Sequence, residues 1–147
     1  MRCYNDVVII LRAIVDTNVI FEGLTKKGGA SGLIIDAWFA GLFRPCVSNA
    51  LAYEYTDVLS RKVSADRWQQ IKPVLGTLLT KADFIPIHYT WRPASPDPAD
   101  EHLIDCALNA GAILVTWNIK DFKSARTSLG LQLMNPVEFL NVLAEQE

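Results

Sequence analysis

The 147-residue sequence predicts an α/β fold in which helices cover both faces of a central, largely parallel sheet of about five strands. Short continuous apolar runs, typical of strands buried on both faces, alternate with longer segments of helical periodicity. No internal repeat, low-complexity tract or linker divides the chain. We therefore expect a single domain over residues 1–147, with residues 1–12 forming a leader and the start of the first strand.

The predicted strands are the apolar runs at 8–15, 43–47, 84–87, 112–115 and 131–134. The predicted helices cover 31–40, 49–62, 65–81, 98–110 and 136–144. Pro73 lies inside the third of these helices, so that segment is either one kinked helix or two helices.

Local chemistry supports several helix starts. Ser48 and Ser64 stand where an N-cap is needed, and Asn135 with Glu138 forms a capping-box pattern. Asp97 precedes a proline in the same way. We interpret Asp97 as a structural cap and not as a ligand, because the cap role accounts for its position.

Composition excludes several classes of protein. The 14 basic and 16 acidic residues give a net charge of −2, and the mean hydropathy is +0.18, so a compact fold is expected and disorder is not. The charge also argues against a broad basic surface for nucleic acid. Three cysteines without a CxxC pair favour a reduced, cytoplasmic protein. The apolar run at 7–11 is too short to span a membrane, and no signal-peptide pattern surrounds it.

Polar side chains follow two of the predicted strands. Asp16 comes directly after the first strand, and Asn118 and Asp121 come after the strand at 112–115. In an open parallel sheet, ligands bind outside the carboxyl ends of the strands. Asp16 is therefore either a helix cap or a group that faces a ligand, because a lone carboxylate is costly to bury.

Two helices supply further acids. At about 100° per residue, Glu54 flanks the apolar stripe of helix 49–62, whereas Asp57 points towards water. In helix 98–110, Asp100 continues the apolar stripe at the N-terminus, whereas Asp105 is expected to be solvated. The helix dipole alone also accommodates Asp100, so a structural role stays open for it.

These segments direct Asp16, Glu54, Asp100 and the pair Asn118 and Asp121 towards one region. Such a cluster repels itself unless protons or cations occupy it. Oxygen-rich carboxylate sites suit Mg²⁺ or Mn²⁺. The sequence therefore indicates a divalent-metal site.

Four segments together resemble the PIN domain, the nuclease fold of VapC-type toxins. They are AIVDTNVI at 13–20, VSNALAYEYTDVLSRK at 47–62, DPADEHLIDCALNAGAILVTWNIKDF at 97–122 and NPVEFL at 135–140. The resemblance implies an endoribonuclease that uses Mg²⁺ or Mn²⁺ to hydrolyse RNA phosphodiester bonds. It also implies a toxin of a toxin–antitoxin pair, held inactive by a small antitoxin protein, and a homodimer.

By motif, Asp16, Glu54 and Asp100 correspond to the family's first three acids, so the resemblance makes them both catalytic residues and metal ligands. The fourth acid normally follows the Val-Thr pair, but this chain has Asn118 there and retains Asp121 before a phenylalanine. Either Asn118 is a neutral ligand or Asp121 supplies the charge. Asn18 and Thr116 would orient the ligands and the attacking water.

Basic and aromatic residues near the same edge are candidates for substrate contacts. The basic candidates are Lys26, Lys27, Arg61, Lys62 and Lys120, each of which is otherwise an ordinary solvated side chain. Trp117 either stacks on a base or packs in the core. His102 is expected to be a surface residue and not a catalytic base.

Two other functions compete with a nuclease. Asn118 at a usual acid position favours a catalytically weakened PIN-fold module that binds RNA or protein. A phosphatase or receiver domain is disfavoured, because no second aspartate lies two residues after Asp16 and no adjacent acid pair ends the first strand.

Overall fold

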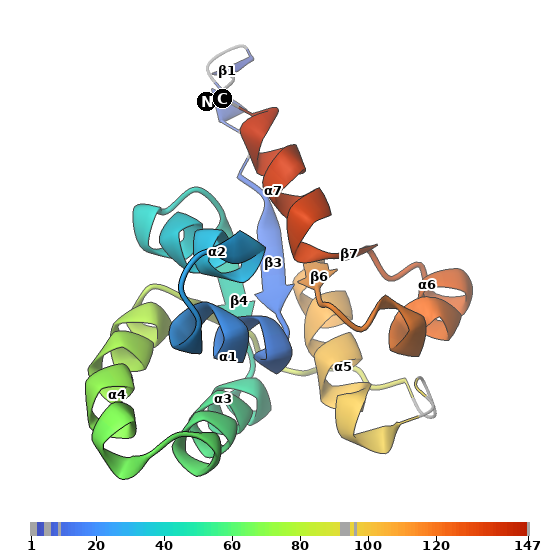
Figure 1. The fold of residues 1–147 in the computed structure, drawn as a ribbon. Helices are drawn as coiled ribbons and strands as arrows, with labels where there is room; N and C mark the ends of the chain where they lie inside the picture. The colour runs from blue at the N-terminus through green and yellow to red at the C-terminus, as the bar shows by residue number, and fades with distance from the viewer. Residues whose placement is uncertain (1–2, 5–6, 9, 92–94, 96, 147) are drawn as a thin grey trace.

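The computed structural model describes residues 3–4, 7–8, 10–91, 95 and 97–146, and its centre is a parallel sheet (Figure 1). The strands of this sheet are β3 (Arg12–Val15), β4 (Arg44–Val47), β5 (Asp83–Phe84), β6 (Ile113–Val115) and β7 (Leu133–Met134). They lie in the order β5-β4-β3-β6-β7, and every neighbouring pair is parallel. The predicted α/β class and the five-stranded sheet are confirmed.

Helices surround this sheet. They are α1 (Thr17–Thr25), α2 (Gly29–Ala40), α3 (Asn49–Lys62), α4 (Ala65–Thr80), α5 (Glu101–Ala110), α6 (Lys123–Leu129) and α7 (Pro136–Ala144), with 3₁₀ turns η1 (Pro98–Asp100) and η2 (Ile119–Phe122). Helix α5 packs on β3, β4 and β6, whereas α2 packs with α1 and α7 in front of the sheet (Figure 1). No helix in the described part of the chain is long and apolar enough to cross a membrane.

The chain start differs from the prediction of one strand over residues 8–15. Strand β1 (Cys3–Tyr4) pairs in antiparallel fashion with β2 (Val7–Val8), and β3 begins only at Arg12. Residue 9 of the predicted strand lies outside the described residues. A continuous apolar run indicates that residues are buried, but it does not show where one strand ends and the next begins. The sequence therefore predicted a single strand where the structure has β2 and β3, which belong to different sheets.

Helix α4 is a single helix through Pro73, which is one of the two alternatives that the sequence left open. Pro73 and Gln69 are both exposed, so water can bind the Gln69 carbonyl, which has no N–H donor at Pro73. Two other helical features differ from expectation. The predicted helix at 98–110 is split into η1 and α5. Helices α1 and α6 were not predicted: α1 follows β3 without a loop, and only Ala125 of the polar α6 is buried.

The predicted caps are confirmed. Ser48 and Ser64 accept hydrogen bonds from backbone N–H groups three residues on, at 3.1 and 3.2 Å. Asn135 and Glu138 form the reciprocal capping box, with bonds of 2.8 and 3.0 Å. Asp97 accepts from the Ala99 N–H at 3.0 Å, as expected for a structural cap.

The strand order places a topological switch at β3. Strands β4 and β6 flank β3, so the connections on its two sides run to opposite edges of the sheet and leave a crevice at the carboxyl ends. The Asp16 N–H donates to the Val115 carbonyl at 2.9 Å, which ties the end of β3 to that of β6. The buried Tyr55 hydroxyl donates to the Val15 carbonyl, which ties α3 to the same point. The fold thus brings three sequence-distant segments to one edge.

We predict that Tyr55→Phe lowers the free energy of unfolding by about 1–2 kcal/mol, because the buried Val15 carbonyl loses its donor from α3. Urea denaturation measures this difference. Tyr53→Phe is the matched control in the same helix, since Tyr53 is 75% exposed, and it should change stability little. Equal effects of the two substitutions would contradict a stabilising Tyr55 bond.

Candidate active site

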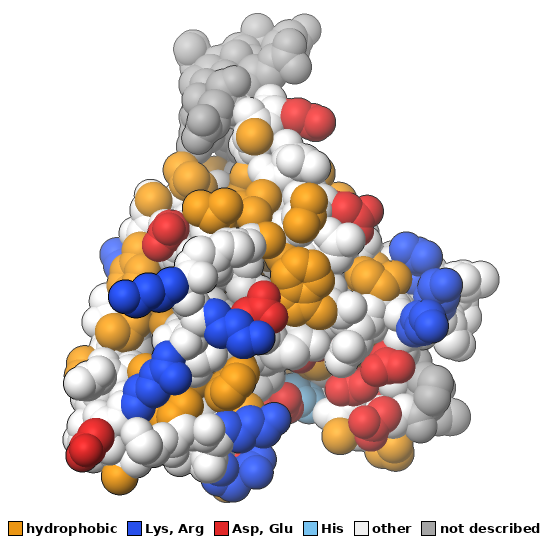
Figure 2. Space-filling view, viewed as in Figure 1, with side chains coloured by type: hydrophobic (Ala, Val, Ile, Leu, Met, Phe, Trp, Pro, Cys, Tyr) orange, Lys and Arg blue, Asp and Glu red, His pale blue; other side chains and the backbone are white. Residues whose placement is uncertain are grey.

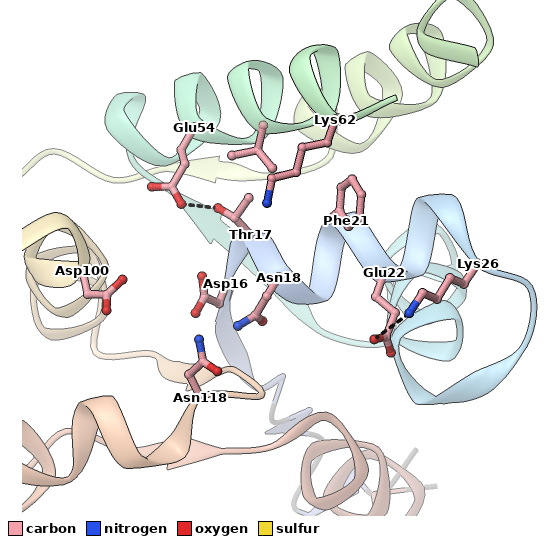
Figure 3. A pocket seen from close by; sticks show the side chains of 11 residues that line it. Asp16, Thr17, Asn18, Phe21, Glu22, Lys26, Glu54, Lys62, Asp100 and Asn118 are labelled. Carbon is pink, nitrogen blue, oxygen red and sulfur yellow. Dashed lines mark hydrogen bonds and ion pairs between the residues drawn. The ribbon is translucent and has the colours of Figure 1, made fainter. Parts of the chain in front are cut away.

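A polar pocket of about 300 Å³ opens at the carboxyl end of β3 (Figure 3). The side chains that line it are Asp16, Thr17, Asn18, Phe21, Glu22, Lys26, Glu54, Val58, Lys62, Asp100 and Asn118. The pocket therefore brings together candidates from α1, α3, η1 and the segment after β6. Figure 3 shows the Asp100 carboxylate and the Asn118 amide both directed towards Asp16.

Asp16 is held from the neighbouring strand. Its carboxylate accepts a 2.8 Å hydrogen bond from the Thr116 hydroxyl, and although Asp16 occupies the N-cap position of α1, its side chain makes no capping hydrogen bond. The Thr116 hydroxyl in turn accepts from the Asn118 N–H at 3.0 Å and from the Asn18 amide at 3.5 Å. Asp16 is 6% exposed, and this burial raises its pKa, while the bond from Thr116 opposes the shift. Asp16 is thus oriented, but its charge is incompletely compensated.

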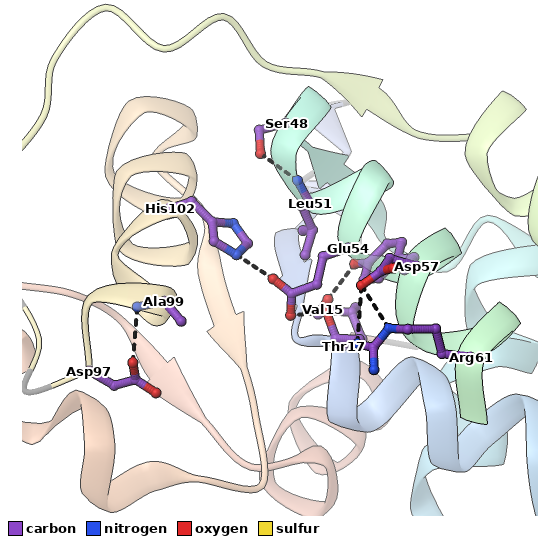
Figure 4. Close-up of polar contacts among 11 residues, drawn as sticks. Val15, Thr17, Ser48, Leu51, Glu54, Asp57, Arg61, Asp97, Ala99 and His102 are labelled. Atoms are coloured by element: carbon purple, nitrogen blue, oxygen red, sulfur yellow. Dashed lines mark hydrogen bonds and ion pairs between the residues drawn. The ribbon is translucent and has the colours of Figure 1, made fainter.

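Glu54 is held on both carboxylate oxygens (Figure 4). Oε1 accepts a 2.7 Å hydrogen bond from the Thr17 hydroxyl, and Oε2 lies 2.5 Å from His102 Nε2. The contact with His102 is the main reason that the pKa of Glu54 lies below its usual value; burial opposes it, and the Thr17 bond assists it. Asp57, also drawn in Figure 4, instead pairs with Arg61 at 3.1 Å on the outer side of α3.

The expectation that His102 is a surface residue is wrong. Its side chain is 23% exposed, and its Nδ1 atom is buried without a hydrogen-bond partner in the described part of the chain. Sequence reasoning also missed Thr17. Each stands within two residues of a selected acid, yet nothing local indicates that the shared partner is Glu54.

The pKa of Asp100 is strongly raised in the fold. Burial first, and then the charges of Asp16, Asp97, Asp121 and Glu54, raise its pKa to about 6. The same repulsion means that a positive charge in the pocket is favourable.

Asp105 was predicted to be solvated, but it is 3% exposed. Its carboxylate accepts from the Trp91 N–H at 3.3 Å, and Asn109 binds the backbone of Tyr89 beside it. The segment over residues 85–91, which has no regular structure, covers this side of α5. A helical projection cannot include such a cover, because it treats every non-core face as open to water.

The two candidates for the fourth acid position are separated. Asn118 lines the pocket, whereas Asp121 is exposed on η2 and does not line it. Asp121 is still near enough for its charge to raise the pKa of Asp100. The pocket itself therefore holds three carboxylates of this set, together with the Asn118 amide.

The predicted basic residues are distributed unevenly. Lys62 and Lys26 line the pocket: the Lys62 ammonium lies 5.6 Å from the centre of the Phe21 ring, and Lys26 pairs with Glu22 at 4.0 Å. Lys27, Arg61 and Lys120 are exposed and do not line it. Figure 2 shows Lys and Arg side chains gathered over α1 and α3, with acidic side chains towards α5.

The donor set fits a hydrated divalent cation. Within the described residues, no three His, Cys, Asp or Glu side chains converge closely enough to hold one ion between them. Mg²⁺ usually keeps several waters and binds through one or two carboxylates, so it does not need such a cage. The pocket offers oxygen donors on Asp16, Asp100 and Asn118, and neighbouring carboxylate charges contribute, after burial, to the raised pKa of Asp100.

Comparison with known families decides the classification. A family model for the PIN domain matches residues 12–120. The chain belongs to the PIN domain family. PIN domains are typically nucleases and are generally metal-dependent, and the matched range contains Asp16, Glu54, Asp100 and Asn118. A search of curated proteins finds no match.

Solved PIN domains of toxin–antitoxin complexes share the fold. The VapBC2 complex of Rickettsia felis, bound to a DNA fragment from its promoter, matches with a TM-score of 0.60 and 16% identity, over 85% of this chain and 98% of that chain. VapBC-1 of nontypeable Haemophilus influenzae matches at 0.59 and 16%, over 86% and 99%. FitAcB of Neisseria gonorrhoeae matches at 0.60 and 14%, over 85% and 98%. These likenesses place the chain beside VapC and FitB toxins in fold.

We predict that Asp100→Asn stabilises the protein in EDTA at pH 7.5. The pKa of Asp100 in the fold is about 6, against a usual 3.8, so above both values its ionisation destabilises the fold. Because Asp100 is only partly buried, we expect a gain on the order of 1 kcal/mol in urea denaturation. Asp36→Asn, at an exposed position on α2, is the control and should be neutral. A loss of stability in Asp100→Asn would contradict the repulsion.

Proposed function

We propose that this PIN domain is a metal-dependent endoribonuclease and the toxin of a toxin–antitoxin pair. The observation that supports the proposal is the convergence of Asp16, Glu54, Asp100 and Asn118 in one polar pocket at the switch point of the sheet. A phosphodiester is the substrate class to which such a pocket is suited, because its negative charge requires the cation that the acids also require.

Each pocket residue has a role in this proposal. Asp16 and Asp100 would hold Mg²⁺ or Mn²⁺, and Thr116 binds the Asp16 carboxylate and thereby orients it. When bound, the divalent ion neutralises the scissile phosphate and lowers the pKa of a water.

Glu54 faces the same space and is oriented by Thr17 and His102, so it would position the attacking water. Asn118 would be the neutral ligand at the fourth position; its backbone N–H and the Asn18 amide both donate to the Thr116 hydroxyl. Asp121 contributes its charge from outside the pocket.

The partners belong to the same proposal. By analogy with the solved VapBC2 and FitAcB complexes we expect a small antitoxin partner, and its role in this proposal is to hold the enzyme inactive. A homodimer is also expected, as is a cytoplasmic location, which the free, buried Cys46 and Cys106 support.

A second candidate function is an RNA- or protein-binding module with weakened catalysis. The observation that favours it is Asn118, which leaves the pocket without a carboxylate after β6. Metal-dependent cleavage distinguishes the two functions directly.

We predict that the purified protein cleaves single-stranded or structured RNA in Mn²⁺ and not in EDTA. Asp16→Asn and Asp100→Asn should each reduce the cleavage rate at least about 100-fold, since even residues that only support metal ligands account for 10–100-fold. Gel analysis of end-labelled RNA measures the rates.

Asp57→Asn is the matched control, because Asp57 lies on α3 but pairs outward with Arg61. Full activity in both site variants would overturn the proposed site. Absence of any metal-dependent cleavage would favour the binding module.

We predict that Asn118→Ala weakens Mn²⁺ binding and cleavage by about 10-fold or more, whereas Asp121→Ala has a smaller effect. The reason is that Asn118 lines the pocket and Asp121 acts only through its charge. Isothermal titration with Mn²⁺ reports affinity separately from activity. If Asp121→Ala proves the more damaging, the fourth ligand has been wrongly assigned.

A further inference from the structure

An exposed indole adjoins the acidic pocket. Trp117 follows Thr116 directly, and 38% of its surface is accessible to solvent. The backbone N of Trp117 and the side-chain oxygen of Asn18 lie 3.5 Å apart, and Asn18 and Asn118 both line the pocket. Trp117 is therefore next in sequence to Thr116 and Asn118 and contacts Asn18 through its backbone, although its ring does not itself line the pocket.

The polar edge of this indole is anchored. Trp117 Nε1 donates a 2.9 Å hydrogen bond to the hydroxyl of Ser31, which is buried in α2. Ser31 in turn donates to Glu22 at 3.1 Å, and Glu22 also lines the pocket. Two helices therefore fix the orientation of a ring that remains accessible.

Trp117 does not pack in the core. Trp38 is 1% exposed at the centre of the core, and Trp68 and Trp91 are partly buried against it. Trp117 is more accessible than any of these three tryptophans. The core-packing alternative left open by the sequence is therefore wrong, and the accessible ring requires another explanation.

We propose that Trp117 is a stacking platform for one unpaired base of the nucleic-acid strand whose phosphate occupies the acidic pocket. This inference rests on the proposed function, and it adds a residue that binds the base. Stacking of a nucleic-acid base on an aromatic side chain is tolerant of sequence, because every base presents a flat face. A base inside a duplex has both faces covered by its neighbours, so the platform selects single-stranded RNA.

Lys62 supports the same placement from across the pocket. Its ammonium lies over the Phe21 ring and is directed into the pocket in Figure 3, where a phosphate next to the bound one can meet it. A strand bound in the pocket would then contact both the Trp117 ring and the Lys62 ammonium.

The test is binding without cleavage. Fluorescence anisotropy of a labelled eight-nucleotide single-stranded RNA is measured with the full chain in Ca²⁺, and a gel verifies that the RNA stays intact. Trp117→Ala should raise Kd about 5- to 100-fold, and Trp117→Phe should restore most of the affinity. Tyr89→Ala is the matched control, since Tyr89 is 70% exposed and is bound to Asn109 near the opposite end of α5.

An abasic scan of the same oligonucleotide separates stacking from a structural effect. At one position, removal of the base should weaken binding to the wild type as much as Trp117→Ala does and should add nothing in that variant. Equal affinity of Trp117→Ala and wild type, no rescue by phenylalanine, or an equal loss with duplex RNA would each overturn the inference.

The binding and cleavage measurements can fail separately. Trp117-dependent binding in a protein that never cleaves RNA supports the platform and rejects the nuclease. Cleavage that does not depend on Trp117, with unchanged affinity, rejects only the platform.

Discussion

The buried carboxylate of Asp16 is the constraint on which the rest of the site depends. A carboxylate at 6% exposure needs a hydrogen-bond donor, and Thr116 supplies it from the next strand of the sheet. That bond exists only because β3 and β6 pair in parallel and end together. Tyr55 fixes α3 to the last residue of β3, and one residue earlier α3 carries Glu54. The end of β3 therefore positions both Thr116, the partner of Asp16, and Glu54.

The clustering of acids in the pocket lowers the stability of the fold, although the proposed function requires it. Burial first, and then neighbouring charges, raise the pKa of Asp100, whereas the contact with His102 is the main reason that the pKa of Glu54 is lowered. A protein selected for stability alone would replace one of these acids with a neutral residue. If the pocket binds a divalent cation, as the proposed function requires, the cation would relieve this repulsion, and the relieved free energy would contribute to metal affinity.

The sequence predicted features that depend on local pattern. Apolar runs located the five strands of the main sheet, and helical periodicity placed Glu54 beside the core face of α3, which agrees with its position at the pocket. Features that depend on distant partners were missed. Asp105 is covered by the segment at 85–91, and His102 contacts a glutamate 48 residues away. No periodicity within one helix encodes either neighbour, so both predictions failed for the same physical reason.

The net charge of −2 has a different meaning once the acids are placed. Four of the 16 acidic residues line one pocket: Asp16, Glu54 and Asp100 lie there with Asn118, and Glu22 pairs with Lys26. Two lysines line the pocket. Lys26 pairs with Glu22, whereas the ammonium of Lys62 lies over the Phe21 ring and makes no ion pair among the contacts of the described residues. One lysine cannot offset the repulsion between a phosphate and three carboxylates. Under the proposed function, a nucleic-acid strand would therefore enter this pocket only with a divalent ion, and contacts that do not involve charge, such as stacking on an aromatic ring, would contribute more to substrate binding.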